Sequence, residues 1–141
     1  MRFPYRGAGI GLVKDNCILM GKRADTPFFG KWAVPGGGFE KGRDLDDLEN
    51  AKREFKEETG IDFDSLDAKQ ISSWTLKAPF FRWTTYFFSV KELDFDSIKP
   101  DEFSEIQWVS IDEVLGKTRK GEKKHFRPFT KSEVRSINNS I

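Results

Sequence analysis

The sequence has little of several residue types that would place it in a specialised class of proteins. Cysteine occurs once, as Cys17, and a single thiol excludes an internal disulfide framework and a cysteine-rich zinc finger. No apolar run approaches the roughly 20 residues that a membrane-spanning helix requires, and the first residues lack the continuous apolar stretch of a signal peptide. We therefore expect a cytoplasmic chain that does not associate with a membrane.

An excess of charge of either sign is also missing. The chain has 24 basic and 23 acidic residues and a formal net charge of +1, so we expect no DNA binding. The charges are nevertheless segregated: residues 92–113 contain eight acids and one base, and residues 117–131 contain seven bases and one acid. The basic segment is either a surface that meets phosphate groups or a solvated loop, and the sequence leaves both interpretations open.

What the chain does have is enough apolar area for a folded core. Its 141 residues include 14 Phe and four Trp, which excludes a disordered chain. The length is typical of one domain, and no composition shift or repeat divides the sequence. We expect a single domain over residues 1–141.

The apolar pattern predicts a mixed β-sheet with helices packed on it, which is an α/β or α+β layered fold. Strands are expected at 8–13, 17–20, 31–34, twice within 71–90 with a break near Ala78–Pro79, and at 106–109. Helices are expected at 44–59, 111–115 and 130–137. In the first helix Leu48, Ala51 and Phe55 form one apolar stripe, and Gly60 stands where a left-handed helix-ending residue is typical.

Three glutamates of this predicted helix share one face. Glu54, Glu57 and Glu58 stand at positions i, i+3 and i+4, a spacing at which like charges destabilise a helix by a few tenths of a kcal/mol. A hard divalent cation such as Mg²⁺ or Mn²⁺ offsets that repulsion, because it prefers clustered carboxylate oxygens. The alternative is a solvated acidic face, which is common on helices.

The segment before the helix favours the metal interpretation. Pro35 and the three glycines Gly36, Gly37 and Gly38 follow a predicted strand and lead toward the acidic helix. Glycines allow the backbone to turn sharply and to approach a ligand closely. A strand, a glycine loop and a carboxylate-bearing helix together indicate a site for a metal ion and a phosphate.

Two stretches of this region resemble the signature of a known family. The span 36–42 (GGGFEKG) followed by 53–61 (REFKEETGI) is similar to the Nudix box, whose second half R-E-U-x-E-E-x-G-U, with U a bulky apolar residue, is matched at every fixed position. The resemblance implies an α/β/α sandwich with the box helix packed on a mixed sheet. It also implies hydrolysis of a pyrophosphate linkage in a nucleoside diphosphate derivative, with Mg²⁺ or Mn²⁺ as cofactor.

One position departs from the family pattern. The chain has a two-residue insertion between the glycine segment and the helix, and no glutamate stands at the first glutamate position of the box. Asp44, Asp46 and Asp47 are the acids that are able to replace it. Because that glutamate mainly supports the box arginine in the family, we expect the helix entry to differ more than the metal face.

The resemblance assigns roles to individual residues. It implies that Glu54, Glu57 and Glu58 are metal ligands, with the carbonyl of Gly36 completing the set, and that Arg53 orients a carboxylate. Glu54 is alternatively a base. Nudix enzymes often take their general base from a distant loop, and the acidic stretch before the last predicted strand is in the expected region. Its candidate bases are Glu102 and Glu105.

Residues outside the box are candidates for substrate contacts. Arg23 ends the first hairpin and is placed to meet a phosphate. Arg82 lies among aromatic residues, where it would flank the nucleobase of a substrate. The backbone of Gly37 and Gly38 is expected to approach the substrate. Several aromatic residues are candidates for stacking on a base, although aromatic residues are mostly core: Trp32, Trp74, Phe80 and Phe81.

Two functions follow from this sequence. The first is a metal-dependent Nudix pyrophosphohydrolase whose substrate is a nucleoside triphosphate, a nucleotide sugar, ADP-ribose or a dinucleoside polyphosphate. The second is a catalytically weak Nudix-like domain that binds a nucleotide or RNA as a sensor or regulator. The intact residues Arg53, Glu54, Glu57 and Glu58 favour the enzyme. Nudix domains often form homodimers, and the sequence locates no interface.

Overall fold

A computed structural model describes residues 4–25, 28–118 and 121–138. Within them, seven strands form one mixed sheet in the order β3-β2-β1-β6-β5, with β4 paired to β1 and β7 paired to β2. The strands are β1 (Tyr5–Lys14), β2 (Cys17–Arg23), β3 (Trp32–Ala33), β4 (Gly36–Gly38), β5 (Ala68–Ala78), β6 (Phe81–Val90) and β7 (Phe103–Ser110). The helices are α1 (Asp47–Thr59), α2 (Ile111–Val114) and α3 (Thr130–Asn138), and the short 3₁₀ helices are η1 (Phe63–Ser65) and η2 (Phe95–Ser97).

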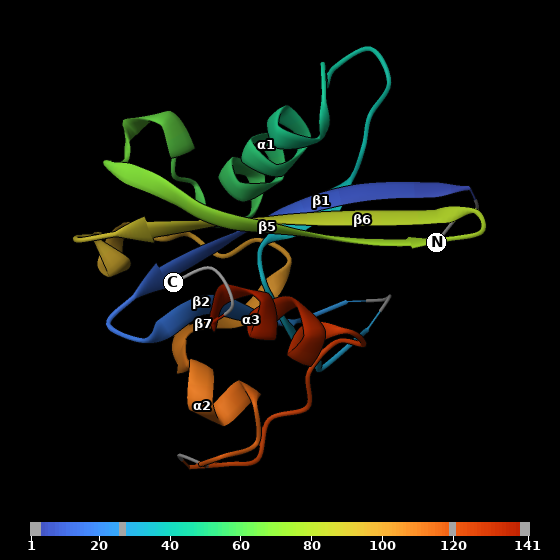
Figure 1. Ribbon diagram of the computed structural model, residues 1–141. Helices are drawn as coiled ribbons and strands as arrows, with labels where there is room; N and C mark the ends of the chain where they lie inside the picture. The colour runs from blue at the N-terminus through green and yellow to red at the C-terminus, as the bar shows by residue number, and fades with distance from the viewer. Residues whose placement is uncertain (1–3, 26–27, 119–120, 139–141) are drawn as a thin grey trace.

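The sheet is covered on both faces (Figure 1). Ile10 and Leu12 of β1 pack with Phe55 of α1 in one apolar cluster. Trp83 of β6 packs with Val134 of α3 in a second cluster. Alternate residues of each strand therefore serve opposite layers. The prediction of an α/β/α sandwich with a mixed sheet is confirmed.

The strands separate beside the centre of the sheet. Strand β2 pairs with β1 only near their hairpin, where Val13 meets Ile18, and then continues along β7 and β3. Strand β4 takes its place along β1 and pairs antiparallel with Gly7, Ala8 and Gly9. On its other edge β1 runs parallel to β6. This separation brings β1, β2, β4 and β6 around one hollow.

The glycine segment is therefore a strand and not the loop that the sequence indicated. Its close approach to β1 requires glycine, because a Cβ on Gly36 would lie 2.6 Å from the carbonyl oxygen of Ala8. A Cβ on Gly37 would lie 2.5 Å from the carboxyl carbon of Glu54. The triple glycine thus allows β4 to be wedged between β1 and α1.

Helix α1 begins three residues later than the predicted start at Asp44. The side chain of Asp46 caps it by accepting a hydrogen bond of 2.9 Å from the backbone N–H of Glu49. Gly60 ends it in the left-handed conformation, with φ of 78°. The predicted end at Thr59 is confirmed, and Asp44 is left free for another role.

The other predicted elements are confirmed with changed bounds. The two strands expected within 71–90 are β5 and β6, joined at Pro79 and Phe80. Strand β7 begins at Phe103 and so contains Glu105, which the sequence placed before the strand. None of the helices among the described residues is long and apolar enough to span a membrane.

Candidate active site

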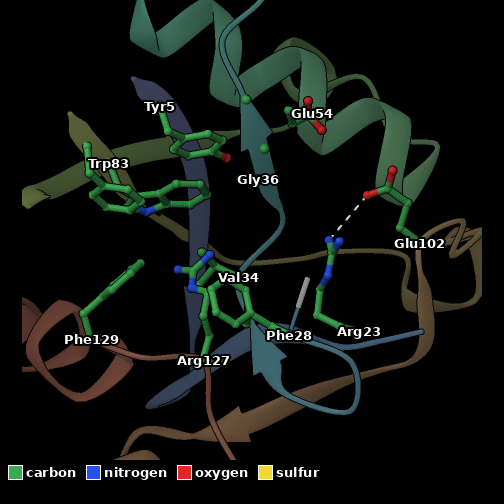
Figure 2. A pocket seen from close by; sticks show the side chains of 14 residues that line it. Tyr5, Arg23, Phe28, Val34, Gly36, Glu54, Trp83, Glu102, Arg127 and Phe129 are labelled. Carbon is green, nitrogen blue, oxygen red and sulfur yellow. Dashed lines mark hydrogen bonds and ion pairs between the residues drawn. The ribbon is translucent and has the colours of Figure 1, made fainter. Parts of the chain in front are cut away.

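The hollow beside β4 is a cavity of about 330 Å³ that combines charged and aromatic walls. Figure 2 shows Glu54, Arg23 and Glu102 at one end, and Trp83, Phe129 and Arg127 at the other. The remaining lining residues are Tyr5, Phe28, Ala33, Val34, Gly36, Gly37, Gly38 and Phe81. The size is within the range of small-molecule sites.

Strand β4 is held to α1 by hydrogen bonds with three side chains of the helix, those of Asn50, Arg53 and Glu58. The backbone N–H of Gly36 donates a hydrogen bond of 2.9 Å to Oε2 of Glu58. Nδ2 of Asn50 donates to the carbonyl oxygens of Gly37 and Gly38 at 3.3 and 3.2 Å. The glycine backbone is thereby held directly over the acidic face of the helix.

Two of the three predicted carboxylates are buried beneath this strand. The side chain of Glu54 is 12% exposed and that of Glu58 is 1% exposed. Burial raises the pKa of Glu54 to about 7 even though Arg53 opposes the rise. Burial, followed by repulsion from Glu54, raises the pKa of Glu58 well above its ordinary range. Both carboxylates would be stabilised in the charged form by a nearby cation.

The third carboxylate lies outside this pair. The side chain of Glu57 is 44% exposed and bonds to Nη1 of Arg53 at 3.2 Å, and it lies 3.5 Å from Nη2 of Arg43. The described part of the chain contains no ready group of three or more His, Cys, Asp or Glu side chains placed to hold a metal ion. The structure therefore buries Glu54 and Glu58 and leaves Glu57 exposed beside Arg43 and Arg53.

The donor set nevertheless suits a divalent cation. Oε1 of Glu58 is buried and has no hydrogen-bond partner among the described residues, and the nearby guanidinium of Arg23 is 3.7 Å away. A buried carboxylate oxygen left without a hydrogen bond is costly. Hard cations take such oxygens as ligands. The residues present therefore fit Mg²⁺ or Mn²⁺.

Of the three acids that are able to replace the missing first glutamate, Asp44 is the one that pairs with Arg53. Its two carboxylate oxygens accept hydrogen bonds from Nε and Nη2 of Arg53, both at 2.8 Å, and its side chain is 2% exposed. These bonds hold the pKa of Asp44 below its usual value. Nη2 of Arg53 also donates to the carbonyl oxygen of Gly38 at 2.9 Å. Arg53 therefore links Asp44, Glu54 and the glycine strand, and its role in orienting a carboxylate stays a prediction.

Arg23 and Glu102 meet at the charged end of the cavity. The pairing of β2 with β7 shifts register between Lys22 and Arg23, and such an irregularity re-aims the side chain that follows. Nη1 of Arg23 lies 3.4 Å from Oε2 of Glu102, whose side chain is 53% exposed (Figure 2). The predicted phosphate contact and one predicted base candidate thus line the same cavity wall.

Two other predicted site residues do not line this cavity. Glu105 lies in β7, where its carboxylate accepts a hydrogen bond from Gln107. Arg82 is bound to Asp47 of α1, whereas its neighbours Phe81 and Trp83 line the cavity. The reason is strand alternation, which directs successive side chains of β6 to opposite faces. Of the four aromatic residues suggested for stacking, only Phe81 is in the lining.

The sequence did not single out Arg127, Phe129 or Trp83 as site residues. Arg127 belongs to the basic segment 117–131, of which the structure describes 117–118 and 121–131. Its side chain is 7% exposed and pairs with buried Glu133. The interval of six residues between an arginine and a glutamate has no meaning before the fold is known. No signal in the sequence separated Arg127 from the other basic residues of that segment.

The chain is similar to known proteins over most of its length. The family description "NUDIX domain" matches residues 4–131. A curated relative, nucleoside triphosphatase NudI of Salmonella paratyphi B, is 33% identical over 118 residues, which cover 73% of this chain and 79% of that protein. The 36 curated proteins that match include NudI from several other Salmonella strains.

Solved structures show the same fold at lower identity. A crystal structure of the MutT protein from Methanosarcina mazei Go1 has a TM-score of 0.68 and 20% identity, and the match covers 96% of this chain and 93% of that one. A bifunctional NMN adenylyltransferase/ADP ribose pyrophosphatase from Francisella tularensis, complexed with AMP and a manganese ion, has a TM-score of 0.63 and 20% identity. That match covers 79% of this chain and 35% of the bifunctional protein.

Proposed function

Because the chain belongs to the Nudix hydrolase family, we propose that it hydrolyses the pyrophosphate linkage of a nucleoside triphosphate with the help of Mg²⁺ or Mn²⁺. We further propose that residues 1–141 form the one domain that does so. The observation that carries the proposal is the buried carboxylate pair of Glu54 and Glu58 beside a glycine strand in the wall of the cavity. The name of the NudI relative supports a triphosphate as substrate.

In this proposal the acidic helix face holds the metal. The ligands are Glu54, Glu57 and Glu58, with the carbonyl of Gly36. The manganese ion bound to the Francisella protein supports this choice of cation. When bound, the cation offsets the charge of the phosphates and lowers the pKa of a coordinated water. Arg53 and Asp44 hold the carboxylates in place through the bonds described above.

The remaining charged residues act on the substrate. Arg23 donates hydrogen bonds to the phosphates, and the backbone of Gly37 and Gly38 lies against them. Glu102 is the general base, since its exposed carboxylate at the cavity wall is able to take a proton from the attacking water. Glu105 remains the second base candidate and Arg82 a second substrate contact. Nucleotides are the expected partners, and a homodimer stays an open prediction.

The first test is a panel of nucleotides. Nucleoside triphosphates, a nucleotide sugar, ADP-ribose and a dinucleoside polyphosphate are each incubated with Mg²⁺, with Mn²⁺ or with EDTA. We expect triphosphates to be hydrolysed fastest and only when a metal is present, and phosphorus NMR of the products identifies the phosphate that leaves. A panel without turnover under either metal contradicts the proposal and favours the nucleotide-sensing domain.

A second prediction concerns the close approach of Gly37 to Glu54. In Gly37→Ala the new Cβ would stand 2.5–2.6 Å from the carboxylate of Glu54, so the carboxylate has to move. A displacement of about 1 Å costs up to about 100-fold in rate, and we expect a loss of kcat/KM of that order with the fold retained.

The neighbouring glycine provides the comparison for this test. In Gly38→Ala the new Cβ would meet the Tyr5 ring at 3.7 Å, which is ordinary van der Waals contact, and we expect a smaller loss. Steady-state kinetics and circular dichroism of both variants decide the matter. Equal losses in the two variants would show that the position of Glu54 is not the cause.

A further inference from the structure

The aromatic end of the cavity contains a buried arginine. The guanidinium of Arg127 lies over the ring of Trp83 at 4.4 Å and over the ring of Phe129 at 4.6 Å. The side chain is 7% exposed and lines the cavity (Figure 2). Glu54 and Glu58, which serve the phosphate end in the proposed function, belong to α1 at the other end. A group at the Arg127 end would therefore be remote from the phosphates.

A chain of hydrogen bonds fixes this guanidinium. Nη2 of Arg127 donates to Oε1 of Glu133 at 2.9 Å. The other oxygen of Glu133 accepts from the hydroxyl of Thr85, which in turn accepts from Nε1 of Trp83 at 2.7 Å. Glu133 is 1% exposed and Thr85 is fully buried. The arginine is thus pre-organised and has little rotamer freedom left to lose when it binds.

Glu133 also decides what kind of group Arg127 attracts. The buried carboxylate offsets the positive charge of the guanidinium, so this end of the cavity is not a strong site for an anion. The guanidinium still has N–H donors to offer a ligand. Among the described residues it donates a hydrogen bond through Nη2, and its buried Nε has no partner. A neutral acceptor satisfies such donors without needing net charge.

The surrounding side chains suit a flat ligand. Tyr5 and Phe81 are stacked with their ring centroids 5.5 Å apart, and both line the same cavity. Phe129 has a positive φ of 65°, a strained conformation for a bulky residue, and its ring is held against Arg127 and Trp83. Flat aromatic groups stack on such walls.

We propose that Arg127 is a specificity-determining residue that donates a hydrogen bond to a carbonyl oxygen of the substrate's nucleobase, and that Glu133 positions it. This inference rests on the proposed function, because it names the base end of the same substrate. Cytosine, uracil, thymine and guanine carry a carbonyl oxygen, whereas adenine has none: its acceptors are ring nitrogens, and its amino group would oppose the guanidinium donors where the other bases can present the carbonyl. The enzyme is therefore selective against adenine nucleotides.

The test measures kcat/KM for CTP, UTP, GTP and ATP. A site built to hydrogen-bond the substrate discriminates strongly against an analogue that leaves it unpaired, and we expect the carbonyl-bearing triphosphates to be preferred by about 10-fold or more. The variant Arg127→Met/Glu133→Gln removes both buried charges together. It should bring the ratio of kcat/KM between the carbonyl-bearing triphosphates and ATP close to one. Lys131→Met removes a charge from an exposed position of α3 outside the cavity and should keep the wild-type preference.

A binding measurement separates this inference from the proposed function. Calorimetry without metal compares the affinities of CMP, UMP, GMP and AMP for the full chain, and AMP should bind most weakly. Arg127→Lys, which keeps a cation opposite Glu133 but lacks the planar fork, should lose the same discrimination even where the double variant does not fold.

The outcomes are distinct. Discrimination in binding without turnover of any triphosphate would contradict the proposed function and support the base contact. Turnover with equal kcat/KM for ATP and the other triphosphates overturns the base contact and leaves the proposed function standing. A preference that persists in Arg127→Lys also overturns it.

Discussion

Glu57→Gln is expected to lower kcat/KM for a nucleoside triphosphate by about 10²- to 10³-fold, the range seen when one preorganised electrostatic group is removed. Glu57 shares a helical face with Glu54 and Glu58, and it is the carboxylate of the three that is open to solvent. Glutamine has nearly the same shape and still accepts a hydrogen bond from Arg53, so the fold should be retained. Only the negative charge that a divalent cation requires is lost.

The matched control is Glu49→Gln on the same helix. Glu49 is exposed and lies two turns before Glu57, so the change in net charge is identical while the proposed metal face is untouched. Metal titrations of activity in both variants show whether the loss follows cation binding. Turnover at the wild-type level in Glu57→Gln would contradict the assignment of Glu57 as a ligand.

Asp44→Asn is expected to lower the free energy of unfolding by about 3 kcal/mol at pH 7. Removing one partner of a buried ion pair typically costs about 3–5 kcal/mol because the other charge is left uncompensated. Arg53 keeps its contacts with Glu54 and Glu57, which places the loss at the lower end. Urea denaturation measures it. Asp64→Asn, which breaks the exposed pair with Lys52, should cost far less.

The effect of Asp44 should depend on pH with a defined sign. The hydrogen bonds from Arg53 lower the pKa of Asp44 in the folded state. The stabilisation is therefore present above the ordinary pKa of an aspartate and is lost as the pH falls through the lower folded-state pKa. The difference between wild type and Asp44→Asn should shrink between pH 5 and pH 3. A difference that stays constant over this range would show that Asp44 stabilises the fold by something other than its charge.

The parts of the fold that depend on local pattern were predictable. Leu48, Ala51 and Phe55 mark the buried stripe of α1, and Gly60 ends the helix as expected. The charged box pattern also located Glu54 and Glu58, because residues three and four apart on a helix share a face. These features need only a few neighbouring residues to be recognised.

The parts of the fold that depend on contacts between residues distant in the sequence were not predictable. Asp44 was one of three equivalent acids until the structure placed it against Arg53. Arg127 was one of seven bases in its segment until Glu133 and Trp83 were seen to enclose it. Arg82 and Glu105 stay predictions, but the sequence did not show that they lie outside this cavity, since strand alternation and strand bounds decide which wall a side chain joins. Spacing along the chain carries no information about such partners.

The parallel pairing of β1 with β6 has a consequence for the order of folding. Tyr5 pairs with Phe81 and Val13 with Ser89. The first strand of the chain, β1, therefore lacks its neighbour on this edge until β6, one of the last strands, has been synthesised. Pairings of such long sequence separation close slowly, since the loop entropy is lost before the contact is gained. Helix α1 and the β5–β6 hairpin are local and are free to form first. The cavity, whose walls come from both strands, is therefore assembled in a late step, and an emerging nascent chain lacks it until β6 has docked.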